Sequence, residues 1–256
     1  MILKLVSGRW LLASVLVLAA AAVMVRLGIW QLDRLEWRLA FNARVQAQMS
    51  AEPLVLDENA LDLDLYSMEY RQVIVTGTYL PEEEIVLRNQ VWDGEFGSEL
   101  GVALFTPLLM EGTNTAILVE RGWIPQANAN QKNRAIYREN GLVTLAGRLR
   151  RAETDFNLNQ WLHPDPALAA NQARLDAWNN LDLERIAIQM ETPLLPVYLQ
   201  LSPDGEQTNP PYATQPSLDL SEGPHLGYAI QWFIFASLLL VGYPMYVQRQ
   251  EAKVKQ

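Results

Sequence analysis

The chain has 256 residues, of which 50% are hydrophobic, with 20 Lys and Arg against 29 Asp and Glu and a mean hydropathy of −0.02. It contains no cysteine, which excludes disulfides, thiolate zinc sites, iron-sulfur clusters, Cys nucleophiles and covalent c-type haem attachment. Its two histidines, His163 and His225, are too few for a three-His zinc site, and no H-E-x-x-H, G-x-S-x-G, G-x-G-x-x-G or G-x-x-x-x-G-K-[ST] pattern points to a standard enzyme.

Charge is divided unevenly along the chain. Six of the bases and one of the acids lie outside residues 31–224, so the ends carry +5 and the middle carries −14. This distribution argues against nucleic acid as a partner, because phosphate binding needs Lys and Arg grouped on one face. Basic, apolar ends are instead typical of segments that contact a lipid bilayer.

The first apolar run predicts a membrane span. Residues 10–25 contain one polar residue, Ser14, and follow Lys4 and Arg9. They cover about 24 Å as a helix, and residues 26–30 extend it towards the roughly 30 Å of the hydrocarbon core. We predict a cytoplasmic N-terminus over 1–9 and a transmembrane helix over 10–30. A cleaved signal peptide with a processing site at 19–22 is the alternative, which the apolar residues 23–25 disfavour.

The residues after this span are predicted to continue the helix outward. Leu32, Leu35, Leu39 and Ala43 recur at steps of three or four residues, and no Pro or Gly interrupts them before residue 50. We therefore expect a helical extension over 31–50.

Residues 51–202 are predicted to form one β-rich domain. Val73, Val75 and Tyr79 alternate with polar residues, and further apolar runs lie between breaks rich in Gly, Asp and Asn. The expected strands lie near 73–79, 85–87, 102–109, 115–119, 142–149 and 196–201, and the expected helices lie near 129–138 and 182–190, the second capped by Asn180 or Asp182. The predicted fold class is an α+β membrane protein, in which two transmembrane helices flank one extracytoplasmic, antiparallel β-rich domain with added helices.

A Pro-rich linker leads to the second span. Residues 203–224 include Pro203, Pro210, Pro211, Pro216 and Pro224, so we expect an extended segment. Residues 226–247 carry no charge and precede a basic end, which predicts a transmembrane helix over 225–247 and a cytoplasmic tail over 248–256. Bases at both ends place both termini in the cytoplasm and the domain outside. Without an Arg-rich transit peptide, we expect a bacterial inner membrane and a periplasmic domain.

The start of the second span carries residues suited to a flat cofactor. His225, Tyr228 and Trp232 share one helix face, where an imidazole can ligate haem iron while aromatic rings pack on the macrocycle. An interfacial aromatic belt with a solvated His225 is the alternative that composition alone favours.

A cationic, aromatic stripe leaves the first span. Trp30, Arg34 and Trp37 lie on adjacent turns and suit a haem propionate or the acidic surface of a partner. Lipid phosphates are the alternative.

Other motifs give weaker signals. Residues 121–125 are expected to end a strand in a compact turn, with Trp123 in the core. The acids after Pro81, Glu82 to Glu84, predict a solvated hairpin loop. His163, between Trp161 and Pro164, is predicted to lie in a loop because it has no second His or Cys with which to bind a metal.

Four motifs in order resemble the Surfeit-locus-one (Surf-one) family of cytochrome c oxidase assembly factors, in its bacterial form. The motifs are Leu27-Gly-Ile-Trp-Gln31 with Arg34 and Trp37, Arg88-Asn89 and Gly97 leading to Thr106-Pro107-Leu108, Arg121-Gly122-Trp123-Ile124-Pro125, and His225-Leu-Gly-Tyr-Ala-Ile-Gln-Trp-Phe233. The resemblance implies two membrane helices around an outer domain and a role in maturing subunit I of a haem-copper oxidase. It also implies haem a as a noncovalent, transient cofactor with His225 as the iron ligand.

The leading hypothesis is therefore a non-enzymatic insertion factor. Haem a is expected to contact His225, Tyr228, Trp232, Trp30, Arg34 and Trp37, and the family motifs add Gly28, Gln31, Arg121, Gly122, Trp123 and Pro125 as structural or docking residues. The expected partners are subunit I and haem a synthase. A membrane-anchored scaffold that binds no haem is the first alternative, and an anchored extracytoplasmic enzyme is the second.

Overall fold

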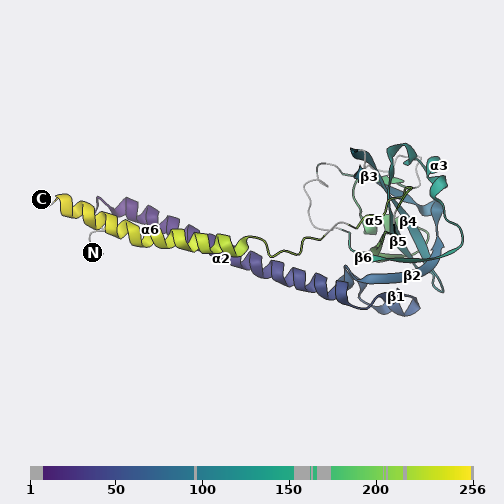
Figure 1. Ribbon diagram of the computed structural model, residues 1–256, viewed down its shortest axis with the longest axis horizontal. Helices are drawn as coiled ribbons and strands as arrows, with labels where there is room; N and C mark the ends of the chain where they lie inside the picture. Colours follow the sequence, from purple (N-terminus) through teal and green to yellow (C-terminus); the bar gives the residue numbers. More distant parts are fainter. Residues whose placement is uncertain are drawn as a thin grey trace. The chain divides into compact units, whose positions relative to one another are not determined.

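A computed structural model of the chain describes residues 8–94, 97–152, 162, 164–165, 174–203, 205, 207–215 and 218–254. These residues belong to two compact units, one formed by Met1–Arg44 with Leu218–Gln256 and the other by Val45–Ser217. Figure 1 labels the elements of both units.

Two long helices, α2 (Leu11–Ser50) and α6 (His225–Val254), carry the apolar ends of the chain. Both are long and apolar enough to cross a membrane, and the chain is a membrane protein. At 1.5 Å per residue, the 40 residues of α2 cover about 60 Å, twice the hydrocarbon core. The helix runs without a break from Leu11 to Ser50, past the residues 10–30 that were predicted as the span.

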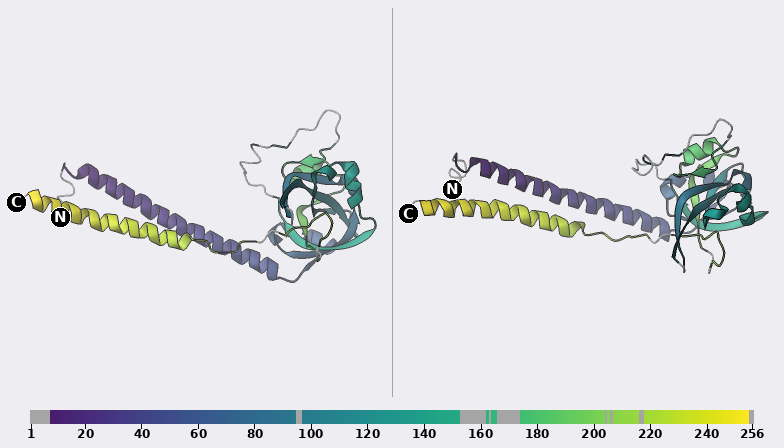
Figure 2. Two further views of the ribbon diagram at one scale, coloured as in Figure 1. Left: turned by 45° about the horizontal axis from the view of Figure 1, so that its top comes forward. Right: turned by 90° about the horizontal axis from the view of Figure 1, so that it is seen from above.

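The two helices pack along one another in the first unit, as both views in Figure 2 show. Small residues lie at this contact: Ala21 is buried on α2, and Ala229 and Ala236 are buried on α6. At Gly28 an added Cβ would lie 2.7 Å from Phe233 Cε1, so the glycine allows the helices to approach closely.

Hydrogen bonds close the helix pair near the chain termini. Trp10 Nε1 donates to Glu251 Oε1 at 2.8 Å, and the hydroxyls of Ser14 and Tyr243 lie 2.9 Å apart. The helices are thus joined by polar contacts where they end and by small residues between.

The second unit is a β-barrel with short helices. Its strands are β1 (Leu54–Leu56), β2 (Gln72–Tyr79), β3 (Ile85–Gly94), β4 (Gly97–Met110), β5 (Ala116–Pro125), β6 (Leu142–Arg150), β7 (Ala177–Trp178) and β8 (Leu194–Leu201). Its helices are α3 (Gln131–Arg134), α5 (Leu183–Ile188) and the 3-10 turns η1 (Glu58–Asp62), η2 (Leu65–Met68), η3 (Pro81–Glu83), η4 (Gln126–Asn128) and η5 (Ala135–Tyr137).

The sheet closes on itself. Its strand order is β1-β2-β6-β8-β5-β4-β3-β7, and β2 also pairs with β4, so β2, β6, β8, β5 and β4 form a ring. The ring is antiparallel except for the parallel pair of β5 with β8. Closure removes the free edges of these strands. The predicted β-rich domain is confirmed, with the refinement that some of its strand pairs are parallel.

The core explains the long apolar runs of the central strands. Ile117 and Val119 of β5 pack inside the barrel, whereas Leu118 between them packs outside against Trp178 and the short helix α5. Because the central strands are covered on both faces, their sequences are continuously apolar rather than alternating.

Most predicted elements are confirmed, often with longer bounds. β3 and β5 extend well beyond the predicted 85–87 and 115–119, and the helix expected at 129–138 is divided into α3 and η5. Asp182, rather than Asn180, caps α5 by accepting the Arg185 backbone N–H at 3.1 Å. The short strands β1 and β7 were not predicted, because three or two residues carry no periodicity.

The prediction of a solvated hairpin loop at residues 82–84 holds for the exposed Glu82 but was wrong about the hairpin and about Glu84. β3 pairs with β4 and β7 rather than with β2, and Glu84 is 4% exposed. Its carboxylate accepts the Thr106 hydroxyl at 2.8 Å and lies 3.0 Å from Arg134 Nε. Burial raises the pKa of Glu84, against the lowering effects of the Thr106 hydrogen bond and the Arg134 charge.

Candidate functional site

The chain enters α6 through a turn that positions His225 as the first helical residue. Gly223 has a φ of +71°, a left-handed conformation that favours glycine. The carbonyl of Pro224 then accepts the Tyr228 backbone N–H at 3.1 Å, which closes the first helical turn. Proline suits this place because its missing N–H needs no partner there.

His225 contacts α2 through a side-chain hydrogen bond. Its Nδ1 lies 2.8 Å from Gln31 Oε1, between residues 194 positions apart in sequence. On the other edge of the ring, a Cβ added to Gly223 would lie 3.3 Å from His225 Cδ2 and 3.4 Å from Nε2. Gly223 thus lies beside this edge of the half-buried ring and places no side chain against it.

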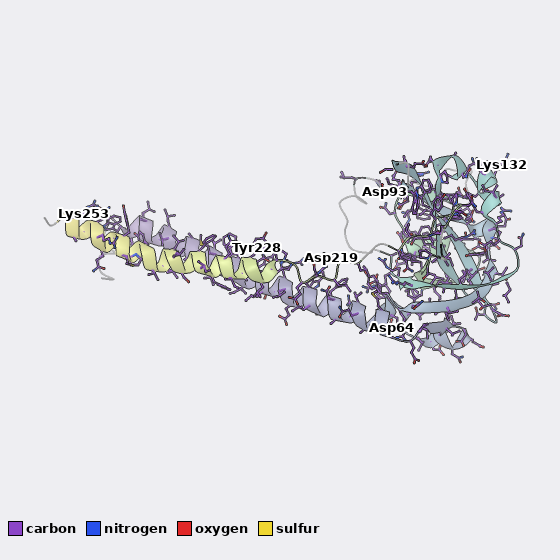
Figure 3. The ribbon with its side chains drawn as sticks, viewed as in Figure 1. Asp64, Asp93, Lys132, Asp219, Tyr228 and Lys253 are labelled. Atoms are coloured by element: carbon purple, nitrogen blue, oxygen red, sulfur yellow. The ribbon has the colours of Figure 1, made fainter. Side chains whose placement is uncertain are left out.

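The segment before His225 is bound to the face of α2 that also carries Gln31. We call residues 219–221 the strap; Figure 3 labels Asp219 just before α6. Arg38 Nε donates to the Ser221 carbonyl at 3.0 Å, and its Nη2 donates to the Asp219 carbonyl. Asn42 Nδ2 donates to the Leu220 carbonyl at 2.6 Å. Gln31, Arg38 and Asn42 are spaced by seven and four residues, so they share one helix face.

Electrostatics support the strap. Ser221 donates its backbone N–H to Asp219 Oδ1 at 2.9 Å, and its hydrogen bonds hold the pKa of the Asp219 carboxyl below its ordinary value. The charge of Arg38, 3.7 Å from Asp219 Oδ2, lowers that pKa further. Asp219 therefore stays ionised at neutral pH and remains available to Arg38.

Replacing Arg38 with Met is expected to loosen the strap. The substitution keeps the alkyl stem but removes the donors to Asp219 and Ser221, a loss of about 1.4 kcal/mol or tenfold in the opening equilibrium. Amide hydrogen exchange at Ser221 should become about tenfold faster. Arg34→Met is the matched control: Arg34 contacts the Trp37 ring rather than the strap, so exchange should be unchanged. Equal exchange in both variants would contradict this role of Arg38.

The predicted aromatic residues lie on accessible helix faces. Tyr228 is 48% exposed, and Trp232 is half-buried with its ring edge-on to Phe235. On α2, Trp30 is 46% and Trp37 is 52% exposed, and Arg34 lies 4.8 Å from the Trp37 ring centre. These rings are free to contact a flat ligand, a partner or lipid.

The structure brings together only part of the predicted set. It joins His225 to Gln31, which the sequence indicated only as a family-motif residue. In the described part of the chain, no hydrogen bond, ion pair or ring contact joins Trp30, Arg34 or Trp37 to His225, Tyr228 or Trp232. The stripe of Trp30, Arg34 and Trp37 lies about one residue step around α2 from the stripe that holds Gln31.

Sequence reasoning missed Arg38 and Asn42. Their signal was available as a polar stripe at helical spacing after Gln31, on a helix whose same face carries Leu35. Their hydrogen-bond partners could not be predicted, because these are main-chain carbonyls of the strap, which no pattern of side chains reveals.

The motif at 121–125 lies inside β5, so the prediction of a compact turn there was wrong. Leu104 pairs with Gly122 while Phe105 pairs with Glu120, which makes Arg121 the extra residue of a β-bulge. Gly122 has a φ of +126°, and a Cβ there would collide with the backbone of Tyr212.

These motif residues stabilise the barrel and its linker. Trp123 is buried, as predicted, and exchanges two backbone hydrogen bonds of 2.9 Å with Tyr212 of the linker. Arg121 is 5% exposed, pairs with Glu139 and lies 4.7 Å from the Tyr79 ring centre. Burial raises the pKa of Tyr79 to about 12, although Arg121 acts in the opposite direction. Pro125 is the last residue of β5.

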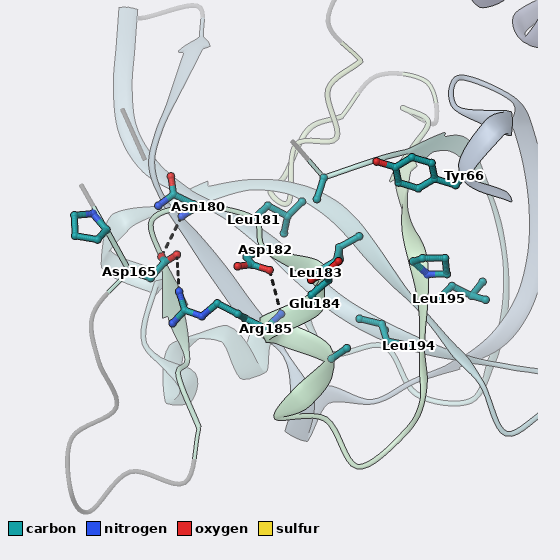
Figure 4. Close-up of a pocket in the computed structure, with 14 residues that line it drawn as sticks. Tyr66, Asp165, Asn180, Leu181, Asp182, Leu183, Glu184, Arg185, Leu194 and Leu195 are labelled. Atoms are coloured by element: carbon teal, nitrogen blue, oxygen red, sulfur yellow. Dashed lines mark hydrogen bonds and ion pairs between the residues drawn. The ribbon is translucent and has the colours of Figure 1, made fainter. Parts of the chain in front are cut away.

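A cavity of about 930 Å³ lies in the second unit between η2, α5 and β8 (Figure 4). Several polar groups on its wall serve the fold. Asp165 accepts the backbone N–H of Asn180 at 3.1 Å and lies 3.6 Å from Arg185, and Asp182 caps α5.

The described residues contain no group of three or more His, Cys, Asp or Glu side chains that could hold a metal ion. His163, predicted to lie in a loop, falls outside the described residues. His225 is therefore the one histidine among the described residues.

Comparison with known proteins gives consistent matches over both helices and the barrel. A model described as the SURF1 family matches residues 18–237. The chain is 30% identical over 232 residues to a SURF1-like protein of Monosiga brevicollis, covering 87% of this chain and 83% of that protein. It is 26% identical over 218 residues to Surfeit locus protein 1 of Homo sapiens, covering 81% and 68%. It is 29% identical over 163 residues to the cytochrome oxidase assembly protein SHY1 of Saccharomyces cerevisiae, covering 59% and 41%.

Proposed function

The chain belongs to the SURF1 family, and from that premise we propose that it assists the assembly of a cytochrome oxidase. The name of the yeast relative, a cytochrome oxidase assembly protein, supports this role. The finer proposal is that the chain promotes insertion of haem a into subunit I of a haem-copper oxidase. It acts as an assembly factor rather than as an enzyme.

The geometry of His225 carries the haem proposal. Its Nδ1 is occupied by Gln31, and among the described residues no hydrogen bond is made by Nε2. Haem iron accepts one imidazole nitrogen as an axial ligand. The donor set fits this chemistry, with Tyr228 and Trp232 on the same helix to pack on the macrocycle and Arg34 on α2 to pair with a propionate.

A transient cofactor suits these residues. The chain contains no cysteine, so haem cannot be attached covalently through thioethers. His225 would hold the cofactor as its single protein ligand, which would suit capture followed by release.

The proposed location follows from charge. Arg9 precedes α2, and Arg249 and Lys253 lie near the end of α6, so we place both termini in the cytoplasm and the barrel on the outer side of a bacterial inner membrane. His225 begins its helix at the outer water-lipid boundary in this orientation. The partners are subunit I, which receives the cofactor, and haem a synthase, which supplies it.

The test is the spectrum of the purified full-length protein. Protein isolated from cells that make haem a should carry it, and protein from cells that lack haem a synthase should not. If protein from haem-a-producing cells contains no haem but co-purifies with subunit I, the haem proposal fails and a scaffold that stabilises an oxidase intermediate remains. If it contains no haem and its loss leaves cytochrome oxidase levels unchanged, the assembly role fails as well.

A further inference from the structure

The hydrogen bond between His225 and Gln31 determines where the ring proton lies. Gln31 Oε1, 2.8 Å from His225 Nδ1, is an amide carbonyl and can only accept. Nδ1 must therefore carry the hydrogen and donate it. A neutral imidazole has one N–H, so the lone pair that can bind a metal lies on Nε2.

The surroundings of Nε2 agree with this assignment. Within the described residues Nε2 has no hydrogen-bond partner, and Gly223, which lies beside that edge of the ring, has no side chain. The nitrogen with the lone pair is thus the one that has no hydrogen-bond partner among the described residues.

Gln31 and His225 are both held by structured elements. Gln31 lies within the unbroken helix α2, and His225 opens α6 four residues after the strap, which Arg38 and Asn42 bind to the same face of α2. The ring and its acceptor are therefore fixed relative to one another within one unit.

We propose that Gln31 is a positioning residue that holds His225 in the Nδ1–H tautomer and so presents Nε2 to the metal. A partner on the second ring nitrogen commonly fixes the tautomer and orientation of metal-binding histidines. A neutral amide also raises ligand basicity less than a carboxylate does, because it is a weaker acceptor and attracts the Nδ1 proton less strongly. Gln31 is therefore suited to a ligand that must release its metal. The identification of the metal as haem iron rests on the proposed function, whereas the assignment of the tautomer does not.

The tautomer is measurable in the haem-free protein. With only two histidines, the full-length chain labelled with ¹⁵N-histidine gives two sets of ring signals, and the variant His163→Gln assigns them. In detergent micelles and alkaline buffer, long-range ¹H–¹⁵N correlations should show a protonated Nδ1 and a bare Nε2 for His225. A protonated Nε2 in the wild-type protein would overturn the proposal.

Substitutions test the cause of this preference. Gln31→Leu should shift His225 towards the Nε2–H form, whereas Gln31→Glu, which keeps an oxygen acceptor, should retain Nδ1–H. Gln46→Leu makes the same change on an exposed face of α2 and should have no effect. If His225 keeps the Nδ1–H tautomer in Gln31→Leu, Gln31 does not determine the tautomer. If that variant does not fold, the wild-type and Gln31→Glu measurements still decide.

Haem affinity provides a second readout. Loss of a residue that orients a metal ligand commonly costs about 10–100-fold in affinity, which is the decrease expected for Gln31→Leu with haem a. Wild-type protein that shows the Nδ1–H form but binds no haem would contradict the proposed function and not the tautomer. Wild-type protein that binds haem, but whose haem-free form carries the proton on Nε2, would contradict the tautomer and not the proposed function.

Discussion

Replacing His225 with alanine is expected to abolish haem a binding by the full-length protein and to leave both units folded. Alanine offers no nitrogen to the iron, and in the proposed site Tyr228, Trp232 and Arg34 supply packing and charge rather than the iron ligand. The substitution removes one hydrogen bond, to Gln31, at the first residue of α6, so the cost in stability should be about 1 kcal/mol. The haem-to-protein ratio and the Soret band of protein purified from haem-a-producing cells measure the loss.

His163→Ala is the matched control, because it removes the other histidine and should leave the spectrum unchanged. Circular dichroism of both variants shows that α2 and α6 remain helical. A His225→Ala protein with an unaltered haem spectrum would exclude His225 as the ligand. If such a variant also retained co-purification with subunit I, protein contacts rather than haem would explain the assembly role.

The fold was largely predictable where local pattern determines it. Uninterrupted apolar runs predicted α2 and α6, and alternation or apolar runs predicted β2, β4 and β6, because each signal lies within one element. The closure of the barrel was not predictable in this way. The β2–β4 contact joins Gly77 to Met110, and β5 pairs with β8 in parallel across a long excursion, so both depend on packing between distant segments.

The sequence predicted which residues belong to the candidate site but not which of their side chains contact one another. An imidazole at the start of an apolar helix indicated His225, and the family resemblance drew attention to Gln31. Nothing in either segment showed that the two side chains meet, since they are 194 residues apart. The stripe of Trp30, Arg34 and Trp37 had the clearer sequence signal, yet the contacts that position His225 come from the less conspicuous stripe beside it.

The acidic run after Pro81 shows that the burial of a charged residue also depends on partners that are distant in the sequence. Three consecutive glutamates normally indicate a solvated loop, and Glu82 is indeed exposed. Glu84 is buried because a cation from α3, Arg134, and a hydroxyl from β4, Thr106, reach it. A buried carboxylate can be predicted only when its partners are known, and here they lie 50 and 22 residues away along the chain.

Replacing Arg134 with Met is expected to destabilise the barrel by about 3–5 kcal/mol, because it leaves the Glu84 carboxylate buried without its cation. Arg134 is 1% exposed, its Nε lies 3.0 Å from Glu84 Oε1 as an ion pair without hydrogen-bond alignment, and its Nη2 donates to Asp176 at 2.5 Å. Methionine fills much of the same volume, so the lost charge dominates the effect. Urea unfolding of the full-length protein in detergent, followed by near-ultraviolet circular dichroism of the buried tryptophans, measures the change.

Arg138→Met is the matched control, because Arg138 pairs with the exposed Glu82 at 3.6 Å and should change stability by less than about 0.5 kcal/mol.

The pH dependence separates lost charge from lost packing. Burial raises the pKa of Glu84, and Arg134 is among the groups that lower it, so the variant should raise that pKa further. A raised folded-state pKa means that the carboxyl contributes most to stability below its unfolded value of 4.5, and that this contribution is lost as the pH rises through the folded value. The stability gap between Arg134→Met and the wild type should therefore narrow as the pH falls from 7 towards 4.5. Adding Glu84→Leu, which removes the stranded carboxylate, should recover most of the loss at pH 7. A gap that stays constant with pH, and that the second substitution does not reduce, would show that Arg134 acts through its packing alone.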